Sequence, residues 1–226
     1  MSEGKRQYPF SLVSVRIVQY ILGFLTLALG VIIILRSDFG AGSWDATVAN
    51  LSLLLNSTLG VASLIINFTI FTIILLFRRR KAYLLIIVPV IMMSLAIDFW
   101  DILIIPDSWL SGSNFLVRLV FFVLGITILP LGLALIITTN FRAGTVDELM
   151  LLIMDYFKTK KVFFIRLFIE ILAIVLAIIF SFLANKSLGA VNYGTLLIAF
   201  LLPPILSFHV YWIRKIIYEK KIKHFI

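Results

Sequence analysis

Two short motifs place an acidic residue three positions after a glycine. The first motif, DFGAGSWD, occupies residues 38–45, and the second motif, NFRAGTVD, occupies residues 140–147. They share Phe, Ala, Gly and Asp at the same four places. We expect a short helix to begin in each motif, with Asp45 and Asp147 in its first turn, where the helix dipole favours a carboxylate by about 0.3–1 kcal/mol.

The residues around each acid predict a sharp turn followed by a helix cap. We expect Gly42 and Gly144 to let the chain turn, since glycine adopts backbone angles that other residues avoid. Thr145 stands three residues before Glu148, which is the spacing of a capping box, in which each side chain bonds the other residue's backbone N–H. Ser43 is placed to cap the first helix in the same way, although no acid follows it at that distance.

Two interpretations of the motifs follow. In the first, they are a duplicated turn-and-cap device without further function. In the second, two helix N-termini converge on a binding site. A bare N-terminus attracts anions, whereas an ionised Asp45 or Asp147 beside it favours a cation or an amine. A protonated aspartate would instead couple transport to protons, because burial raises the pKa of a carboxyl group.

Further ionisable residues interrupt the apolar segments. Asp98 and Asp101 stand at i and i+3 of one apolar run, and Arg166 and Glu170 stand at i and i+4 of another. Ionisable groups inside a membrane span are costly and suggest a function, so all four are candidate binding residues. The alternatives are a position near the membrane surface for the two aspartates and a mutually neutralising pair for the other two. Asn67 is expected to make an interhelical hydrogen bond.

Composition identifies the elements that must position these groups. The chain has 226 residues, of which 62% are hydrophobic and 14% charged, with a mean hydropathy of +1.13. Soluble domains are about 45–50% apolar and about 25% charged, so we predict an all-α integral membrane protein. Runs near the roughly 20 residues that cross a bilayer occur at about 17–36, 60–77, 83–105, 117–137, 162–183 and 194–213.

Two further apolar segments, near 45–57 and 147–158, are too short to cross upright and are expected to be re-entrant or interfacial helices. Six crossings with a cytoplasmic N-terminus leave only Arg36, Arg118 and Lys186 outside. If the short segments also crossed, the RRRK cluster at 78–81 would lie outside, against the positive-inside rule. Both termini, the tails 1–15 and 214–226, are therefore expected in the cytoplasm, with membrane lipid as a partner of the basic tail.

The two motifs belong to a longer internal repeat. An offset of 102 residues (140 minus 38) aligns 16–45 with 118–147 without a gap, including matched Arg, Gly and Asp positions. The predicted units, 16–110 and 116–213, hold three crossings each, and an odd number of crossings inverts the second unit. Inverted repeats with short or broken helices recur in secondary transporters, where the site lies at the repeat interface.

Several kinds of chemistry find no support in the sequence. The chain has no cysteine, no HExxH and no GxSxG motif, so we expect no enzyme activity, no metal site and no cofactor. There are 20 basic residues against 11 acidic ones, but they flank the apolar runs, which predicts no nucleic-acid partner. The sequence leaves open whether the chain forms a homo-oligomer.

The motifs and their spacing resemble the YczE/YyaS/YitT family of bacterial multi-spanning membrane proteins. The family's turns read closer to G-x-G-P-W-D and G-x-G-P-x-D, whereas this chain has Ser43 and Thr145 where proline is typical and Arg142 where glycine is typical. The resemblance covers about 16–210 and extends to Asp98, the Arg166–Glu170 pair and the YGT at 193–195. It implies the same membrane architecture.

These observations predict a secondary transporter or exporter of a small polar solute or ion, which works by alternating access across the bacterial inner membrane. The sequence contains no P-loop, so the energy would come from a gradient or a partner. The alternative is a non-transporting accessory or scaffold protein of the membrane.

Overall fold

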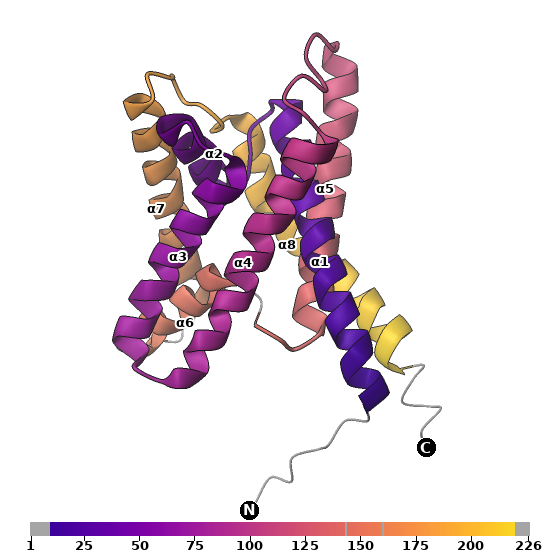
Figure 1. Cartoon of the computed structure of the whole chain (residues 1–226), viewed down its shortest axis with the longest axis vertical. Coiled ribbons are helices and arrows are strands. Elements are labelled where there is room, and N and C mark those ends of the chain that lie inside the picture. Colours follow the sequence, from indigo (N-terminus) through magenta and orange to yellow (C-terminus); the bar gives the residue numbers. More distant parts are fainter. Residues whose placement is uncertain (1–9, 143, 160, 220–226) are drawn as a thin grey trace, which may run out of the picture.

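The computed structural model describes residues 10–142, 144–159 and 161–219, and all regular structure in these ranges is helical (Figure 1). Six helical segments there are long and apolar enough to cross a membrane: Val13–Ser37, Leu59–Arg78, Tyr83–Ile104, Phe115–Thr138, Val162–Leu183 and Tyr193–Ile216. They confirm the six predicted spans. Two short helices lie between spans at the predicted places and begin two residues earlier than expected.

The elements follow one another along the chain as α1 (Phe10–Ser37), α2 (Ser43–Leu55), α3 (Leu59–Arg78), η1 (Lys81–Ile86), α4 (Ile87–Asp98), η2 (Phe99–Ile104), α5 (Phe115–Thr138), α6 (Thr145–Tyr156), α7 (Val162–Leu183), α8 (Tyr193–Ile213) and η3 (Arg214–Glu219). The third span is therefore composite, because a 3-10 turn precedes α4 and a π-helical turn follows it. Such turns are frequent at functional or strained positions of helices.

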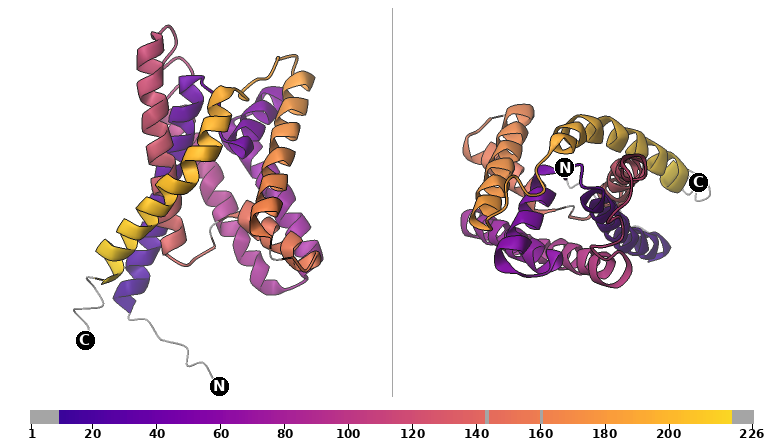
Figure 2. Two further views of the ribbon diagram at one scale, coloured as in Figure 1. Left: turned by 180° about the vertical axis from the view of Figure 1, so that it is seen from behind. Right: turned by 90° about the horizontal axis from the view of Figure 1, so that it is seen from above.

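Helices α1 and α5 form the most extensive contact between described elements and lie side by side in both views (Figures 1 and 2). Glycines allow this close approach. A Cβ atom at Gly30 would lie 2.5 Å from the backbone nitrogen of Leu129, and one at Gly132 would lie 2.5 Å from the Cα atom of Leu27. Small residues bring helix backbones together in the same way in many membrane proteins.

The two short helices differ in their burial. Most residues of α2 are buried, and the helix packs against α7 and α3. Thr47 donates a hydrogen bond to the carbonyl of Ala173 (2.8 Å), and Asn50 donates one to Ala177 (2.9 Å). By contrast, α6 buries only Thr145 and Leu152 among its residues. Helix α2 is thus enclosed by the bundle, while α6 lies at its periphery with its first turn inside.

Left-handed backbone occurs at matching places in the two halves of the chain. Asp38 and Asn140, which end α1 and α5, both have φ of 61°, and Asn56 and Lys158 follow α2 and α6 with φ of 50° and 48°. Each pair is separated by the same 102 positions as the two motifs. Asparagine and aspartate adopt this conformation more readily than other non-glycine residues. This preference accounts for Asp38, Asn140 and Asn56 but not for Lys158.

Candidate functional site

A central cavity of about 210 Å³ lies between the spans, where α2 and α6 begin. Its lining comes from α1, α2, α3, α4 and α5, from residues 144–147 and from α7. Three ionisable side chains, Asp45, Asp147 and Arg166, line it together with the polar residues Ser63 and Asn67. The structure therefore brings the acidic residues of both motifs to one cavity, although 102 residues separate them.

The first turn of α6 differs from the predicted capping box. Thr145 is the first residue of the helix rather than its cap, and its buried hydroxyl donates a hydrogen bond to the Oδ1 atom of Asn67. Glu148 forms an ion pair with Arg142. The prediction of a capping box was wrong, because the side chains of Thr145 and Glu148 bind Asn67 and Arg142 in place of the backbone N–H groups of the first turn. The expected interhelical hydrogen bond of Asn67 is confirmed.

The first turn of α2 has a similar arrangement. Ser43 is buried and is also the first helical residue, with Gly42 at the cap position and no side-chain cap bond. The Ser43 hydroxyl donates to the Oε2 atom of Glu170 on α7. The predicted cap of this helix was therefore wrong as well. In both motifs the hydroxyl beside the glycine fixes the start of a short helix to a neighbouring span.

The two glycines do not supply the turn that we expected of them. Gly42 has φ of −56° and Gly144 has φ of −174°, and any residue adopts these values. The residues with positive φ are Asp38 and Asn140, at the start of each motif, and Gly40 of the first motif, which has φ of 113°. Gly42 instead provides space, since a Cβ atom there would lie 2.7 Å from the Oδ2 atom of Asp45.

Arg166 connects two carboxylates at the edge of the central cavity. Its Nη1 atom lies 2.8 Å from Oδ1 of Asp147, and its Nε atom lies 2.8 Å from Oε1 of Glu170. The predicted Arg166–Glu170 pair is confirmed, but one guanidinium serves two acids. Burial, with a further contribution from the Glu170 carboxylate, raises the pKa of Asp45 to about 7. The site thus carries more negative than positive charge.

In the described ranges, no three His, Cys, Asp or Glu side chains gather as metal ligands.

Asp98 and Asp101 lie elsewhere and are not among the described residues that line this cavity. Asp98 accepts two hydrogen bonds at the start of α3, one from the backbone of Gly60 to Oδ1 (2.7 Å) and one from the hydroxyl of Thr58, the N-cap residue of α3, to Oδ2 (2.9 Å). Asp101 forms an ion pair with Arg36 at the end of α1. Both aspartates therefore have local structural partners, and the structure does not bring them to Asp45 and Asp147.

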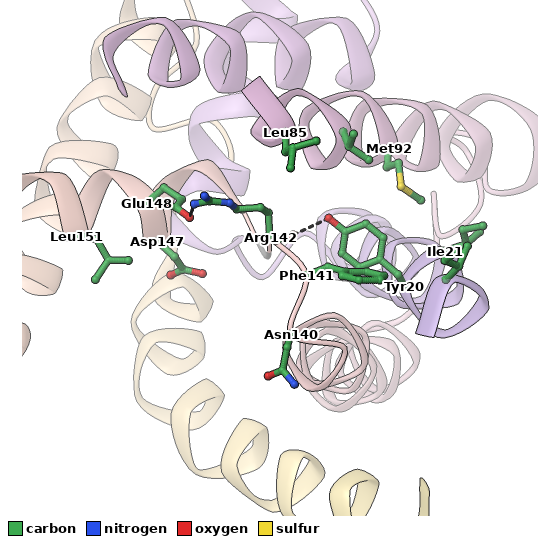
Figure 3. Close-up of a pocket in the computed structure, with 13 residues that line it drawn as sticks. Tyr20, Ile21, Leu85, Met92, Asn140, Phe141, Arg142, Asp147, Glu148 and Leu151 are labelled. Carbon is green, nitrogen blue, oxygen red and sulfur yellow. Dashed lines mark hydrogen bonds and ion pairs between the residues drawn. The ribbon is translucent and has the colours of Figure 1, made fainter. Parts of the chain in front are cut away.

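A second, large cavity of about 860 Å³ lies beside the central one (Figure 3). Gly144 and Asp147 line both cavities, so the two adjoin at the start of α6. Tyr20 is held at the large cavity by a hydrogen bond from its hydroxyl to the carbonyl of Arg142 (2.5 Å). Sequence reasoning missed this cavity. Arg142, at a position where the resembling family has glycine, was the available signal.

The two motifs differ in how they pack. In the first, the carbonyl of Phe39 accepts a hydrogen bond from the backbone of Gly194 (2.8 Å), and the backbone N–H of Ala41 donates to Ala190 (3.1 Å). The first motif is thus held against the start of α8. In the second, the corresponding Phe141 lines the large cavity. One motif is closed over by a span, and the other borders an open volume.

Comparisons with known proteins agree with the architecture. The family of unknown function DUF6198 matches residues 14–210. An uncharacterized protein of Bacillus subtilis (strain 168), YyaS, is 29% identical over 178 residues, which is 79% of this chain and 84% of that protein. The uncharacterized membrane protein YczE of the same strain is 29% identical over 191 residues, covering 84% and 82% of the two chains. No solved structure matches.

Proposed function

The chain belongs to the family of unknown function DUF6198, and from the geometry of its core we propose that it is a secondary transporter of a small polar solute or ion. One observation carries the proposal: Asp45 and Asp147, from the two halves of the chain, line the same central cavity between the spans. Paired short helices whose first turns meet inside a membrane bundle are typical of transporter binding sites.

Alternating access requires two halves that exchange roles, and reciprocal contacts support an inverted repeat. A Cβ atom at Gly23 would meet Ile136, and one at Gly125 would meet Ile34. The two pairs are related by the offset of 102 residues, because Gly125 lies 102 positions after Gly23 and Ile34 lies 102 positions before Ile136. The contacts of Gly30 with Leu129 and of Gly132 with Leu27 obey the same rule. A two-fold axis between α1 and α5 would produce these pairs, with units 16–110 and 116–213.

The difference between the motifs supports a conformation that is open on one side. The first motif is hydrogen-bonded to the start of α8, whereas Phe141 and Arg142 of the second border the large cavity. In an exchange of roles, the second motif would close against α4 while the first separates from α8. The positive-inside rule places the RRRK cluster at 78–81 in the cytoplasm with both termini, so the large cavity would face the cytoplasm.

The test is solute flux in proteoliposomes loaded with the pH dye pyranine. Alkali cations, choline, amino acids and a quaternary ammonium ion with an apolar substituent are added one at a time, with radiolabelled uptake as a second readout. We expect flux for at least one solute, and a loss of flux in both Asp45→Asn and Asp147→Asn. The matched control is Asp155→Asn, since Asp155 is on the same helix as Asp147 but pairs with Arg78 and lines neither cavity.

Flux that survives both substitutions would remove the two carboxylates from the mechanism. If the reconstituted protein moves none of these solutes, with its orientation verified by labelling, transport is refuted and the accessory or scaffold function is favoured. These two results separate the role of the carboxylates from the existence of transport.

A further inference from the structure

The large cavity has the size and the lining of a site for an organic ligand. Its volume of about 860 Å³ lies within the 300–1,000 Å³ that is typical of small-molecule pockets. Apolar side chains of α1, η1, α4 and α6 form most of its wall: Ile17, Ile21, Leu85, Val88, Met92 and Leu151. Five of these six side chains are also exposed on the surface of the chain, so the cavity is an open groove whose wall favours an apolar body rather than a bare inorganic ion.

Charged groups gather where the chain enters α6. They are Arg142, Asp147 and Glu148, and Figure 3 shows them together and apart from Met92 and Ile21, with Asn140 separate from them and Leu151 on their other side. The hydroxyl of Tyr20 is engaged with the carbonyl of Arg142. The cavity is therefore amphipathic, with its charged groups gathered at the boundary with the central cavity.

The charges at that end do not balance. Glu148 is neutralised by Arg142, whereas Asp147 shares the guanidinium of Arg166 with Glu170. One carboxylate is therefore in excess, before Asp45 in the adjoining cavity is considered. The side chain of Asp147 is 43% exposed, so a ligand in the cavity can reach it.

From this juxtaposition we propose that the large cavity binds an organic cation, whose apolar body packs against α1 and α4 and whose positive charge lies at Asp147. The proposal rests on the proposed function, because it narrows the transported ion to this class. The charge of the cation would balance the excess carboxylate, and its apolar part would replace water along the wall.

A phospholipid is a competing occupant, because its acyl chain would also pack against the apolar wall. Its phosphate would then lie beside the excess carboxylate, where like charges repel. An anionic amphiphile meets the same objection. Sign of charge, rather than shape or hydrophobicity, therefore distinguishes the proposed ligand from the alternatives.

The test uses a pair of probes with the same shape and opposite charge, tetraphenylphosphonium and tetraphenylborate. Binding of each to the full-length protein is measured by equilibrium dialysis in detergent, with protein-free micelles subtracted. We expect saturable binding of tetraphenylphosphonium and none of tetraphenylborate. Asp147→Asn should weaken tetraphenylphosphonium binding about ten-fold or more, because it removes the uncompensated charge.

Two further variants separate charge from volume and from folding. Val88→Trp should weaken binding because its larger side chain occupies space along the apolar wall. Asp155→Asn should leave the affinity unchanged, since Asp155 pairs with Arg78 and does not line the cavity. Thermal unfolding of each variant shows whether it is folded. If Asp147→Asn does not fold, the two probes on the unsubstituted protein and Val88→Trp still decide.

Equal binding of the two probes would overturn the proposal, and so would binding that neither Asp147→Asn nor Val88→Trp weakens. The dialysis needs no gradient, so its outcome is separate from that of the flux assay. Binding of tetraphenylphosphonium without flux of any solute would retain the site and refute transport. Flux of another solute without such binding would retain transport and refute this ligand class.

Discussion

The contact between α1 and α5 offers a sharp test of the packing, through Gly132→Ala. The added Cβ atom would lie 2.5 Å from the Cα atom of Leu27 and 2.8 Å from the carbonyl carbon of Thr26, and closer still to the backbone nitrogen of Leu27. All three are backbone atoms, so no side-chain rotation relieves the overlap. Carbon atoms pack at about 3.5–4.0 Å, and the two helices must therefore separate by on the order of 1 Å.

That displacement sets the expected magnitude. Overpacking in a well-packed interior costs about 1–3 kcal/mol, and the contact affected here is the most extensive one between described helices. The substitution Gly30→Ala, 102 positions earlier, should cost a similar amount, because its Cβ would lie 2.5 and 2.6 Å from backbone atoms of Leu129.

Gly144→Ala is the matched control. Its φ of −174° suits alanine, and no described atom lies within 4 Å of the added Cβ, so we expect little change in stability. The measurement is reversible unfolding in mixed detergent and dodecyl sulfate micelles, followed by circular dichroism. If Gly132→Ala is as stable as Gly144→Ala, the close packing of α1 against α5 is refuted.

Four further predictions test other parts of the structure. Asn50→Ala should lower the free energy of unfolding by about 1–3 kcal/mol in the same assay, because it leaves the backbone N–H of Ala190 (2.9 Å from Oδ1) without its acceptor; an unchanged stability would contradict this. Asp98→Ala should lower the free energy of unfolding by about 1–3 kcal/mol, because it leaves the backbone N–H of Gly60 without its acceptor although Thr58 still caps α3. A loss of tetraphenylphosphonium binding would argue against a purely structural role. The pKa of Asp45 is raised to about 7, so this group is mostly neutral at pH 6 and mostly ionised at pH 8. The affinity for tetraphenylphosphonium should therefore rise between pH 6 and pH 8. A rise of equal size in Asp45→Asn would refute the assignment of this pH dependence to Asp45. The side chain introduced by Arg80→Cys should react with a membrane-impermeant maleimide only from the cytoplasmic side, and labelling of intact cells would reject the predicted orientation.

Length and hydropathy are enough to place the membrane-spanning helices along the chain. The spans at 60–77 and 162–183 were predicted within one residue of the observed Leu59–Arg78 and Val162–Leu183, because a bilayer demands long apolar segments and leaves few alternatives. The first turns of α2 and α6 contain the predicted acids for a similarly local reason. The predicted helix caps were wrong, since a hydroxyl such as that of Thr145 can donate to acceptors on other helices that the local sequence does not reveal.

Which acids lie together was a matter for the tertiary structure. Asp45, Asp98 and Asp147 look alike in the sequence, yet Asp98 accepts a hydrogen bond from the start of α3 while the other two line one cavity. The large cavity was also invisible, because its wall joins residues of α1, α4 and α6 that carry no distinctive pattern. The sequence by itself determined the membrane-spanning elements, since these depend on composition over about 20 residues. Only the folded chain decided the site, since the crossing of α1 and α5 and the docking of each short helix set distances between residues that are far apart in the sequence.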